Sequence, residues 1–195
     1  HFFRTGGSSG TIAKAMSAYD KDFSDSIYGI EEDGRYVTES RLKKMLSHEV
    51  NLIEARLNRE KHPHKMFFSY ANTVATIDFA KQFKGHGWVG IRYQLDANQE
   101  YNEIILHIRF KEMDARLQQE TLGVLGVNLI YGAYYKYNDP KKLLRYLYDH
   151  LDKDQLEIDT INFSGPLFDA VDNRLMSLQL VKNGMTDAVM FNPDG

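Results

Sequence analysis

A short run of glycine and hydroxyl residues near the start of the chain has the composition of an anion-binding loop. Glycines let backbone N–H groups converge, serine and threonine add hydroxyl donors, and a following helix adds free N–H groups and a favourable dipole. A helix is predicted over residues 11–19, with Lys14 within about a turn of its start. The predicted anion-binding residues are Gly6, Gly7, Ser8, Ser9, Gly10, Thr11 and Lys14.

The spacing of this loop differs from that of the nucleotide P-loop. That motif reads G-x-x-x-x-G-K-[ST], whereas Gly10 is followed by Thr11 and Lys14 comes too late. A plain glycine turn with a hydroxyl cap is the alternative interpretation. Anion binding further predicts a positive φ at Gly7 or Gly10.

Basic residues gather on one face of a predicted hairpin. Residues 88–95 and 103–110 alternate between apolar and polar side chains, which predicts two antiparallel strands with one buried face. Arg92, His107 and Arg109 then share the polar face, where they suit an anionic ligand. The alternative is a solvated, charged face without a ligand.

His86 lies between two glycines at the mouth of this hairpin. An accessible imidazole there is a candidate general acid or base near neutral pH, the alternative being a simple turn residue. His62 and His64 are close together but lack a third ligand nearby, so no metal site is predicted.

A second candidate loop follows the strand predicted over residues 156–163. Ser164 leads into a helix that carries Asp169 and Asp172 on one side, where they are candidates to hold a cation or a ribose. Acidic residues that complement the helix dipole are the alternative. The chain ends in Asn-Pro-Asp-Gly, predicted to lie at the same edge of the sheet.

The elements that position these residues predict an α/β or α+β fold with a mixed sheet. The sheet combines the antiparallel hairpin with a C-terminal parallel strand-helix-strand unit, because a strand is predicted on each side of a helix there. A first strand over residues 2–5 and a polar, irregular stretch over residues 20–36 complete the N-terminal part. The other predicted elements are helices over residues 38–61, 113–137, 140–151 and 167–182 and strands over residues 65–70, 156–163 and 186–191.

The helix predicted over residues 113–137 is apolar nearly all round and supports a rival interpretation. Such a helix must be covered on every side, so Leu122, Leu125 and Leu129 are predicted to be buried within one chain. Tyr134, Tyr135 and Tyr137 near its end are the predicted contacts to a partner or a further segment.

Composition excludes several classes of protein. The chain has 195 residues and no cysteine, so disulfides and thiolate sites are absent. With a net charge of −3, it lacks the overall positive charge that is typical of proteins that bind nucleic acids. No apolar run is long enough to cross a membrane. We expect one domain of a cytoplasmic protein, and the start at His1 indicates a fragment of a longer chain.

Three stretches, residues 3–11, 85–88 and 171–182, resemble a family of uncharacterised cytosolic bacterial proteins, and the resemblance extends over the whole chain. Names attached to such proteins include nicotinate-nucleotide adenylyltransferase and TonB-dependent receptor. Neither name fits the residues: the adenylyltransferase motif His-x-Gly-His is represented only by Gly85-His86-Gly87, and the strand series of the receptors is missing. The resemblance therefore supplies no catalytic residue.

Together these features predict a domain that binds a phosphorylated small molecule or nucleotide, with a group-transfer enzyme as the form that catalysis would take. His86 is the predicted acid–base residue, and no cofactor is identified. The alternative is a non-catalytic assembly or homo-oligomer module that uses the apolar, tyrosine-rich helix. Neither a nucleic acid nor a membrane is expected as a partner.

Overall fold

The computed structural model describes residues 2–78, 80, 82 and 85–191. Three short 3-10 helices, at Phe2–Thr5, Ser8–Gly10 and Pro166–Phe168, accompany the main elements. The helices are α1 (Lys21–Tyr28), α2 (Glu39–Arg56), α3 (Ala115–Tyr135), α4 (Pro140–Tyr146) and α5 (Asn173–Lys182). The strands are β1 (Phe68–Ala75), β2 (His86–Tyr93), β3 (Asn102–Phe110) and β4 (Leu156–Ser164).

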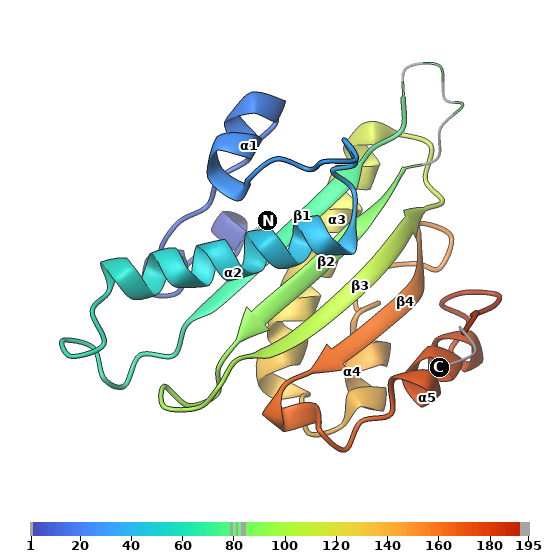
Figure 1. Ribbon diagram of the computed structural model, residues 1–195. Helices are drawn as coiled ribbons and strands as arrows, with labels where there is room; N and C mark the ends of the chain where they lie inside the picture. Colours follow the sequence, from blue (N-terminus) through green and yellow to red (C-terminus); the bar gives the residue numbers. More distant parts are fainter. Residues whose placement is uncertain (1, 79, 81, 83–84, 192–195) are drawn as a thin grey trace.

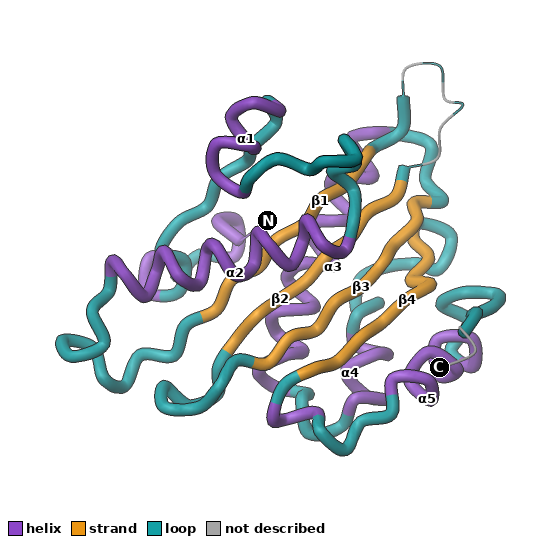
Figure 2. Tube along the Cα trace, in the orientation of Figure 1, coloured by secondary structure: helices purple, strands orange, loops and turns teal. Residues whose placement is uncertain are grey.

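The strands form a sheet in the order β1-β2-β3-β4, and every neighbouring pair is antiparallel (Figures 1 and 2). The predicted hairpin of β2 and β3 is confirmed. The predicted parallel unit, and with it the mixed sheet, is wrong: residues 186–191 form no strand. After α5 the chain only touches the edge of β4, where the Ile158 amide donates to the Met185 carbonyl. Helices around an antiparallel sheet correspond to the α+β alternative.

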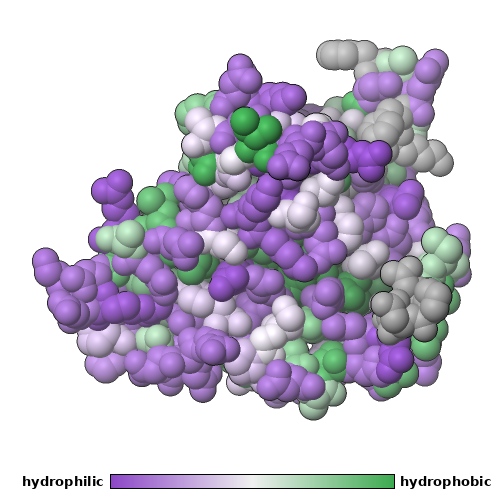
Figure 3. All heavy atoms as spheres, viewed as in Figure 1, coloured by the Kyte–Doolittle hydropathy of each residue, from purple (hydrophilic) through white to green (hydrophobic). Residues whose placement is uncertain are grey.

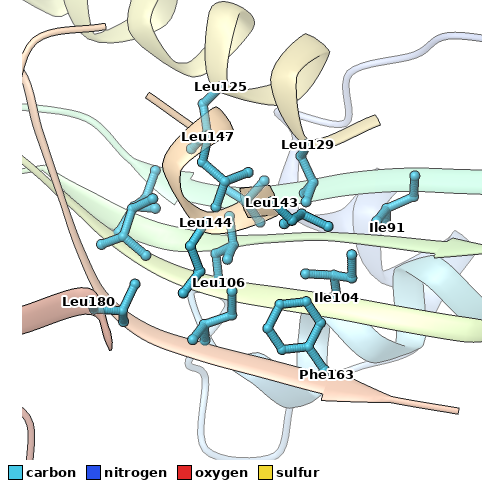
Figure 4. Packing of buried hydrophobic residues seen from close by; sticks show 14 of the residues in the cluster. Ile91, Ile104, Leu106, Leu125, Leu129, Leu143, Leu144, Leu147, Phe163 and Leu180 are labelled. Atoms are coloured by element: carbon cyan, nitrogen blue, oxygen red, sulfur yellow. The ribbon is translucent and has the colours of Figure 1, made fainter. Parts of the chain in front are cut away.

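One face of the sheet carries the main core, formed with α3, α4 and α5. Because side chains alternate along a strand, every second residue of β2 and β3 points to this face. Figure 4 shows Ile91, Ile104 and Leu106 meeting leucines from α3 and α4. Leu125 and Leu129 are fully buried, as predicted, whereas Leu122 is partly buried. The apolar helix is therefore covered largely by its own chain.

The opposite face, called the front face below, is covered only in part. Helix α2 lies across β1 and β2, and its Leu42 and Leu46 pack on Ala71 and Ile105 (Figure 1). Within the described residues no helix covers β4 or the end of β3 near Arg109 (Figure 2). Hydrophilic residues dominate the surface seen from this side (Figure 3). This open part of the front face is where polar side chains of β2, β3 and β4 meet solvent.

The predicted helix over residues 11–19 and the predicted strand over residues 2–5 are both wrong. Helix α1 forms instead at Lys21–Tyr28, within the stretch expected to be irregular. Its N-cap Asp20 accepts a hydrogen bond from the Phe23 amide. Polar residues of this segment have a partner that local sequence does not reveal, because the almost fully buried Arg41 of α2 contacts both Asp25 in α1 and Glu31 after it.

Candidate functional site

Two histidines lie next to each other on the open part of the front face. The register of β2 and β3 sets His86 opposite Arg109 and Trp88 opposite His107. Directly opposite residues of a sheet point to the same face, so all four side chains gather there. The Trp88 ring lies against the His107 ring, with 4.9 Å between the ring centroids. The hairpin thus builds the first half of a site.

A β-bulge in β4 supplies the acidic partner. His107 pairs with Thr160 and Ile108 pairs with Ile158, so Asp159 is an extra residue without a cross-strand partner. A bulge re-aims a side chain, and such irregularities are common beside active sites. Here the bulge brings the Asp159 carboxylate to His107 and Arg109 on the neighbouring strand.

The four groups form a continuous hydrogen-bonded chain. The Asp159 carboxylate lies 2.6 Å from His107 Nδ1 through one oxygen and accepts from Arg109 Nε at 2.6 Å through the other. His107 Nε2 lies 3.2 Å from His86 Nδ1. Since a carboxylate only accepts, His107 Nδ1 donates to Asp159, and the tautomers of the two rings set which nitrogen donates between His107 Nε2 and His86 Nδ1. We call this arrangement the Asp–His–His chain.

Burial and charge bias the protonation of this chain. Burial acts to raise the pKa of Asp159, but hydrogen bonds from His107 and Arg109 outweigh burial and hold that pKa below its usual range. Burial lowers the pKa of His86, and the neighbouring His107 and Arg109 lower it further. The site thus favours an ionised carboxylate beside a neutral His86 at neutral pH.

This geometry can move a proton and hold an anion. A carboxylate fixes the tautomer of an imidazole and stabilises its cationic form, which is how acid–base histidines are commonly oriented. The Arg109 side chain is 60% exposed. Arg109 contacts Asp159 through Nε. Its two terminal amino groups make no hydrogen bond or ion pair with the described part of the chain. A guanidinium with donors directed to solvent suits a phosphate or carboxylate.

Arg92 lies outside this chain, although it shares the predicted face. It is opposite Glu103, four residues along β3 from His107, which corresponds to about 13 Å. Its guanidinium donates to Glu103 at 2.9 Å and lies over the Tyr101 ring. The predicted basic cluster therefore separates into His107 with Arg109 and a distant Arg92 that is already paired.

The glycine loop lies elsewhere and lacks the predicted helix. Gly6 and Gly7 have φ values of +73° and +68°, so the positive φ is confirmed at Gly7 but not at Gly10. The amides of Thr11 and Ile12 both donate to the Ser8 carbonyl. Lys14 pairs with Glu49 at 2.7 Å. These contacts occupy part of the donor set on which the anion-binding prediction depends.

A small hollow of about 110 Å³ borders the loop, lined in part by Gly6, Gly7, Phe68 and Ile130. Phe68 and Ile130 belong to the core side of β1 and α3, so the hollow and the histidines lie on different sides of the sheet. Ser9 and Gly10 are exposed. Anion binding by this loop stays a prediction, and the loop is not part of the Asp–His–His site.

The second predicted loop shows the capping role that was its alternative. The Asp172 carboxylate accepts from the Arg174 amide at the start of α5 and pairs with the Arg174 side chain at 3.2 Å. These hydrogen bonds lower the pKa of Asp172. Ser164 and Asp169 are exposed. Residues 192–195, predicted to converge on them, lie outside the described residues.

Asp159 is a residue of this candidate site that the sequence analysis did not identify. The sequence of β4 contains a signal for this residue. The apolar residues lie at even positions up to Ile158, with Leu156 before it, and at odd positions from Ile161 on, with Phe163 after it. Two consecutive polar residues between apolar neighbours indicate a bulge. With the hairpin face already predicted, this phase change would have placed a carboxylate next to His107.

Comparison with known proteins adds no family to this geometry: the chain matches no family model, no curated protein and no solved structure. The family resemblance of the sequence therefore stays a prediction. Within the described residues no group of three or more His, Cys, Asp or Glu side chains is arranged to hold a metal ion. Nor is any described helix long and apolar enough to span a membrane.

Proposed function

We propose that the open part of the front face binds a phosphorylated small molecule or nucleotide and carries out acid–base chemistry on it, as a group-transfer enzyme would. The observation that carries the proposal is the Asp–His–His chain ending beside an exposed arginine. A cytoplasmic location, taken from the lack of cysteine and the family resemblance, belongs to the same proposal.

The roles follow from the order of the chain. Arg109 offers its terminal N–H groups to a phosphate oxygen, and its own charge is balanced by Asp159. His107 and His86 accept a proton from an attacking hydroxyl group or water and pass positive charge toward the Asp159 carboxylate. The proton that leaves the nucleophile then resides on the imidazole pair and is available for the leaving group.

The fold does not leave the leucines of α3 available for the alternative function, assembly with a partner. Leu125 and Leu129 are buried against the sheet, so they are not available to a partner. Tyr135 remains exposed, whereas Tyr134 and Tyr137 are partly buried against the core. A homo-oligomer stays a prediction without a further observation in its favour.

Ligand titration followed at the imidazoles tests the proposal. The ¹H–¹⁵N resonances of His86 and His107 should shift when the full chain is titrated with inorganic phosphate or a phosphomonoester. Arg109→Gln should reduce the phosphate affinity about ten-fold, because a charge-assisted hydrogen bond is lost. Arg174→Gln is the matched control, since Arg174 is 61% exposed and also pairs with an aspartate.

Two results would contradict the proposal. One is the absence of any phosphate-dependent change at His86 and His107. The other is an equal loss of affinity in Arg109→Gln and Arg174→Gln, which would indicate that phosphate responds only to surface charge. Circular dichroism of each variant establishes that the comparison is made between folded proteins.

A further inference from the structure

A second cavity lies on the other side of the sheet, at the end of α3 and along α4. It has a volume of about 420 Å³, within the range of small-molecule sites. Its walls are Lys136, Lys142, Arg145, Tyr146, Tyr148 and Asp149. Helices α3 and α4 pack on the core face, so the sheet separates this cavity from the Asp–His–His chain (Figure 1). Neither the predicted sites nor the proposed function uses these residues.

The cavity is locally basic in a chain that is acidic overall. Between residues 136 and 149 there are four Lys or Arg residues against two Asp residues, whereas the whole chain has a net charge of −3. Lys142 has a solvated pairing with Asp139 at 3.5 Å. Arg145 is exposed and its side chain makes no ion pair or hydrogen bond with the described residues. The cations outnumber the carboxylates in this segment, and such a local excess of positive charge favours an anion.

One aromatic wall residue of the cavity, Tyr146, belongs to a group of neighbouring tyrosine rings. Tyr131 lies on Tyr135 with ring centroids 4.6 Å apart and an interplanar angle of 28°. Tyr131 also meets Tyr146 at 5.0 Å and 34°. Tyr146 reaches the cavity wall, and Lys136 lies over its ring at 5.7 Å. The series gives the basic cavity a flat aromatic side against which a planar ligand can stack.

Hydrogen bonds hold another part of the cavity wall in place. The Tyr148 hydroxyl donates to the Leu156 carbonyl at 2.9 Å, which ties the tyrosine to the start of β4. Asn128 of α3 donates to the carbonyls of Leu147 and Asp149, and thereby anchors the segment that carries Tyr148 and Asp149. These hydrogen bonds fix part of the wall of an open cavity, which reduces the ordering cost of binding there.

We propose that this cavity binds a planar aromatic phosphate, of which a nucleoside monophosphate is the representative class. The phosphate lies between Lys142 and Arg145, the base stacks on Tyr146, and the Asp149 carboxylate accepts from a ribose hydroxyl. The site is independent of the proposed function, because its residues lie on the opposite side of the sheet. A long nucleic acid is not the expected ligand, since the basic residues occupy one cavity rather than a continuous stripe.

Three probes separate the contributions of charge and stacking. Calorimetric titration of the full chain should show that AMP binds at least ten-fold more tightly than ribose 5-phosphate, which lacks the base, or adenosine, which lacks the phosphate. Arg145→Gln should weaken AMP binding about ten-fold. Lys141→Gln is the control, because Lys141 is an exposed cation on the same helix that does not line the cavity.

Tyr146→Leu tests the stacking contact and should reduce the AMP affinity to that of ribose 5-phosphate. Arg145 is exposed, so Arg145→Gln keeps the proposal testable if the Tyr146 variant does not fold. Arg109→Gln should leave AMP binding at this cavity unchanged, which distinguishes this site from the proposed acid–base site. AMP binding at this cavity in the Arg109→Gln variant can therefore persist even when the front face binds no phosphate.

Equal affinities for AMP and ribose 5-phosphate would overturn the proposal, as would equal losses in Arg145→Gln and Lys141→Gln. So would sedimentation showing a dimer that Tyr131→Ser dissociates, together with no AMP binding to the monomer. In that case the tyrosines serve a second copy of the chain rather than a nucleotide.

Discussion

At the residue scale, Asp159 accepts hydrogen bonds from both His107 and Arg109, and its side chain is 16% exposed. The Thr160 hydroxyl also donates to this carboxylate, so removing its charge affects three donors at once. Asp159→Asn should lower the free energy of unfolding by about 1.5–3 kcal/mol, the usual range for hydrogen bonds to a charged group. The measurement is urea unfolding at pH 7.

Asp172→Asn is the control for this substitution. Asp172 also accepts from a backbone amide and an arginine, but its side chain is 38% exposed and it caps a helix, where asparagine serves equally well. We expect a change within about 0.5 kcal/mol. Equal losses in the two variants would mean that Asp159 contributes no more than a surface carboxylate.

The residues of this site illustrate how far the sequence leads. Strict alternation in two strands predicted the shared face of Arg92, His107 and Arg109, because side-chain direction in a strand is a local property. The distance between Arg92 and His107 along the sheet is not a local property, because it depends on the strand register, which sets Arg92 opposite Glu103. The phase change in β4 indicates a bulge at Asp159, but the contact of its carboxylate with Arg109 depends on pairing with a strand about fifty residues away.

At the scale of elements, α2 approaches the sheet closely over Gly90. A Cβ atom at this position would lie 3.0 Å from a Leu42 methyl carbon and 3.1 Å from one of Leu46. Gly90→Ala should therefore force the helix or the leucines to shift and destabilise the protein by about 1–3 kcal/mol. Thermal unfolding followed by circular dichroism measures the effect.

Gly10→Ala provides the comparison, because a Cβ atom there meets nothing within 4 Å and the residue has no positive φ. We expect its melting temperature to stay close to that of the wild type. If Gly90→Ala were equally neutral, the packing of α2 on the front face would be looser than the structure describes.

A buried arginine connects α1 to α2, and this connection explains one error of sequence reasoning. Arg41 donates to Ser24 at 2.7 Å and to Glu31 at 3.1 Å, so a polar segment is ordered by a residue that follows it in the chain. Apolar residues predicted both α2, which has one apolar face, and α3, which is apolar nearly all round. It could not predict α1, whose stability comes from contacts with Arg41 and Glu49.

Arg41→Gln should release this segment. Loss of the buried guanidinium leaves Asp25 without its cation and Glu31 with only Lys44, and breaking a buried ion pair typically costs about 3–5 kcal/mol. We expect cleavage between residues 20 and 36 in limited proteolysis under conditions in which the wild type is resistant. Lys43→Gln, which removes an exposed cation of α2, should leave the proteolysis pattern unchanged.

At the scale of the whole molecule, the sheet divides the polar chemistry into two independent parts. The front face carries the Asp–His–His chain, and the helical side carries the tyrosine-lined basic cavity. The same four strands hold both, because alternation sends one set of side chains into the core with α3 and the other to the open face. Because the strands that carry the front-face side chains also form the core, the protonation of these side chains affects the stability of the whole fold.

That linkage predicts how stability depends on pH. The pKa of His86 is lowered in the folded protein, first by burial and then by His107 and Arg109, whereas an unfolded histidine has a pKa of about 6.5. As the pH falls below that value, the unfolded chain takes up a proton that folded His86 resists, so the free energy of unfolding decreases until the pH passes the folded pKa. Asp159, whose folded pKa is lowered, adds a further loss as the pH falls below the ordinary range of an aspartate.

Urea unfolding at pH 7 and pH 5 should therefore show a smaller difference in His86→Gln than in the wild type, whereas His64→Gln, in an exposed loop, should retain the wild-type difference. An unchanged pH dependence in His86→Gln would show that folded His86 does not resist protonation, and the acid–base role of the Asp–His–His chain would lose its electrostatic basis.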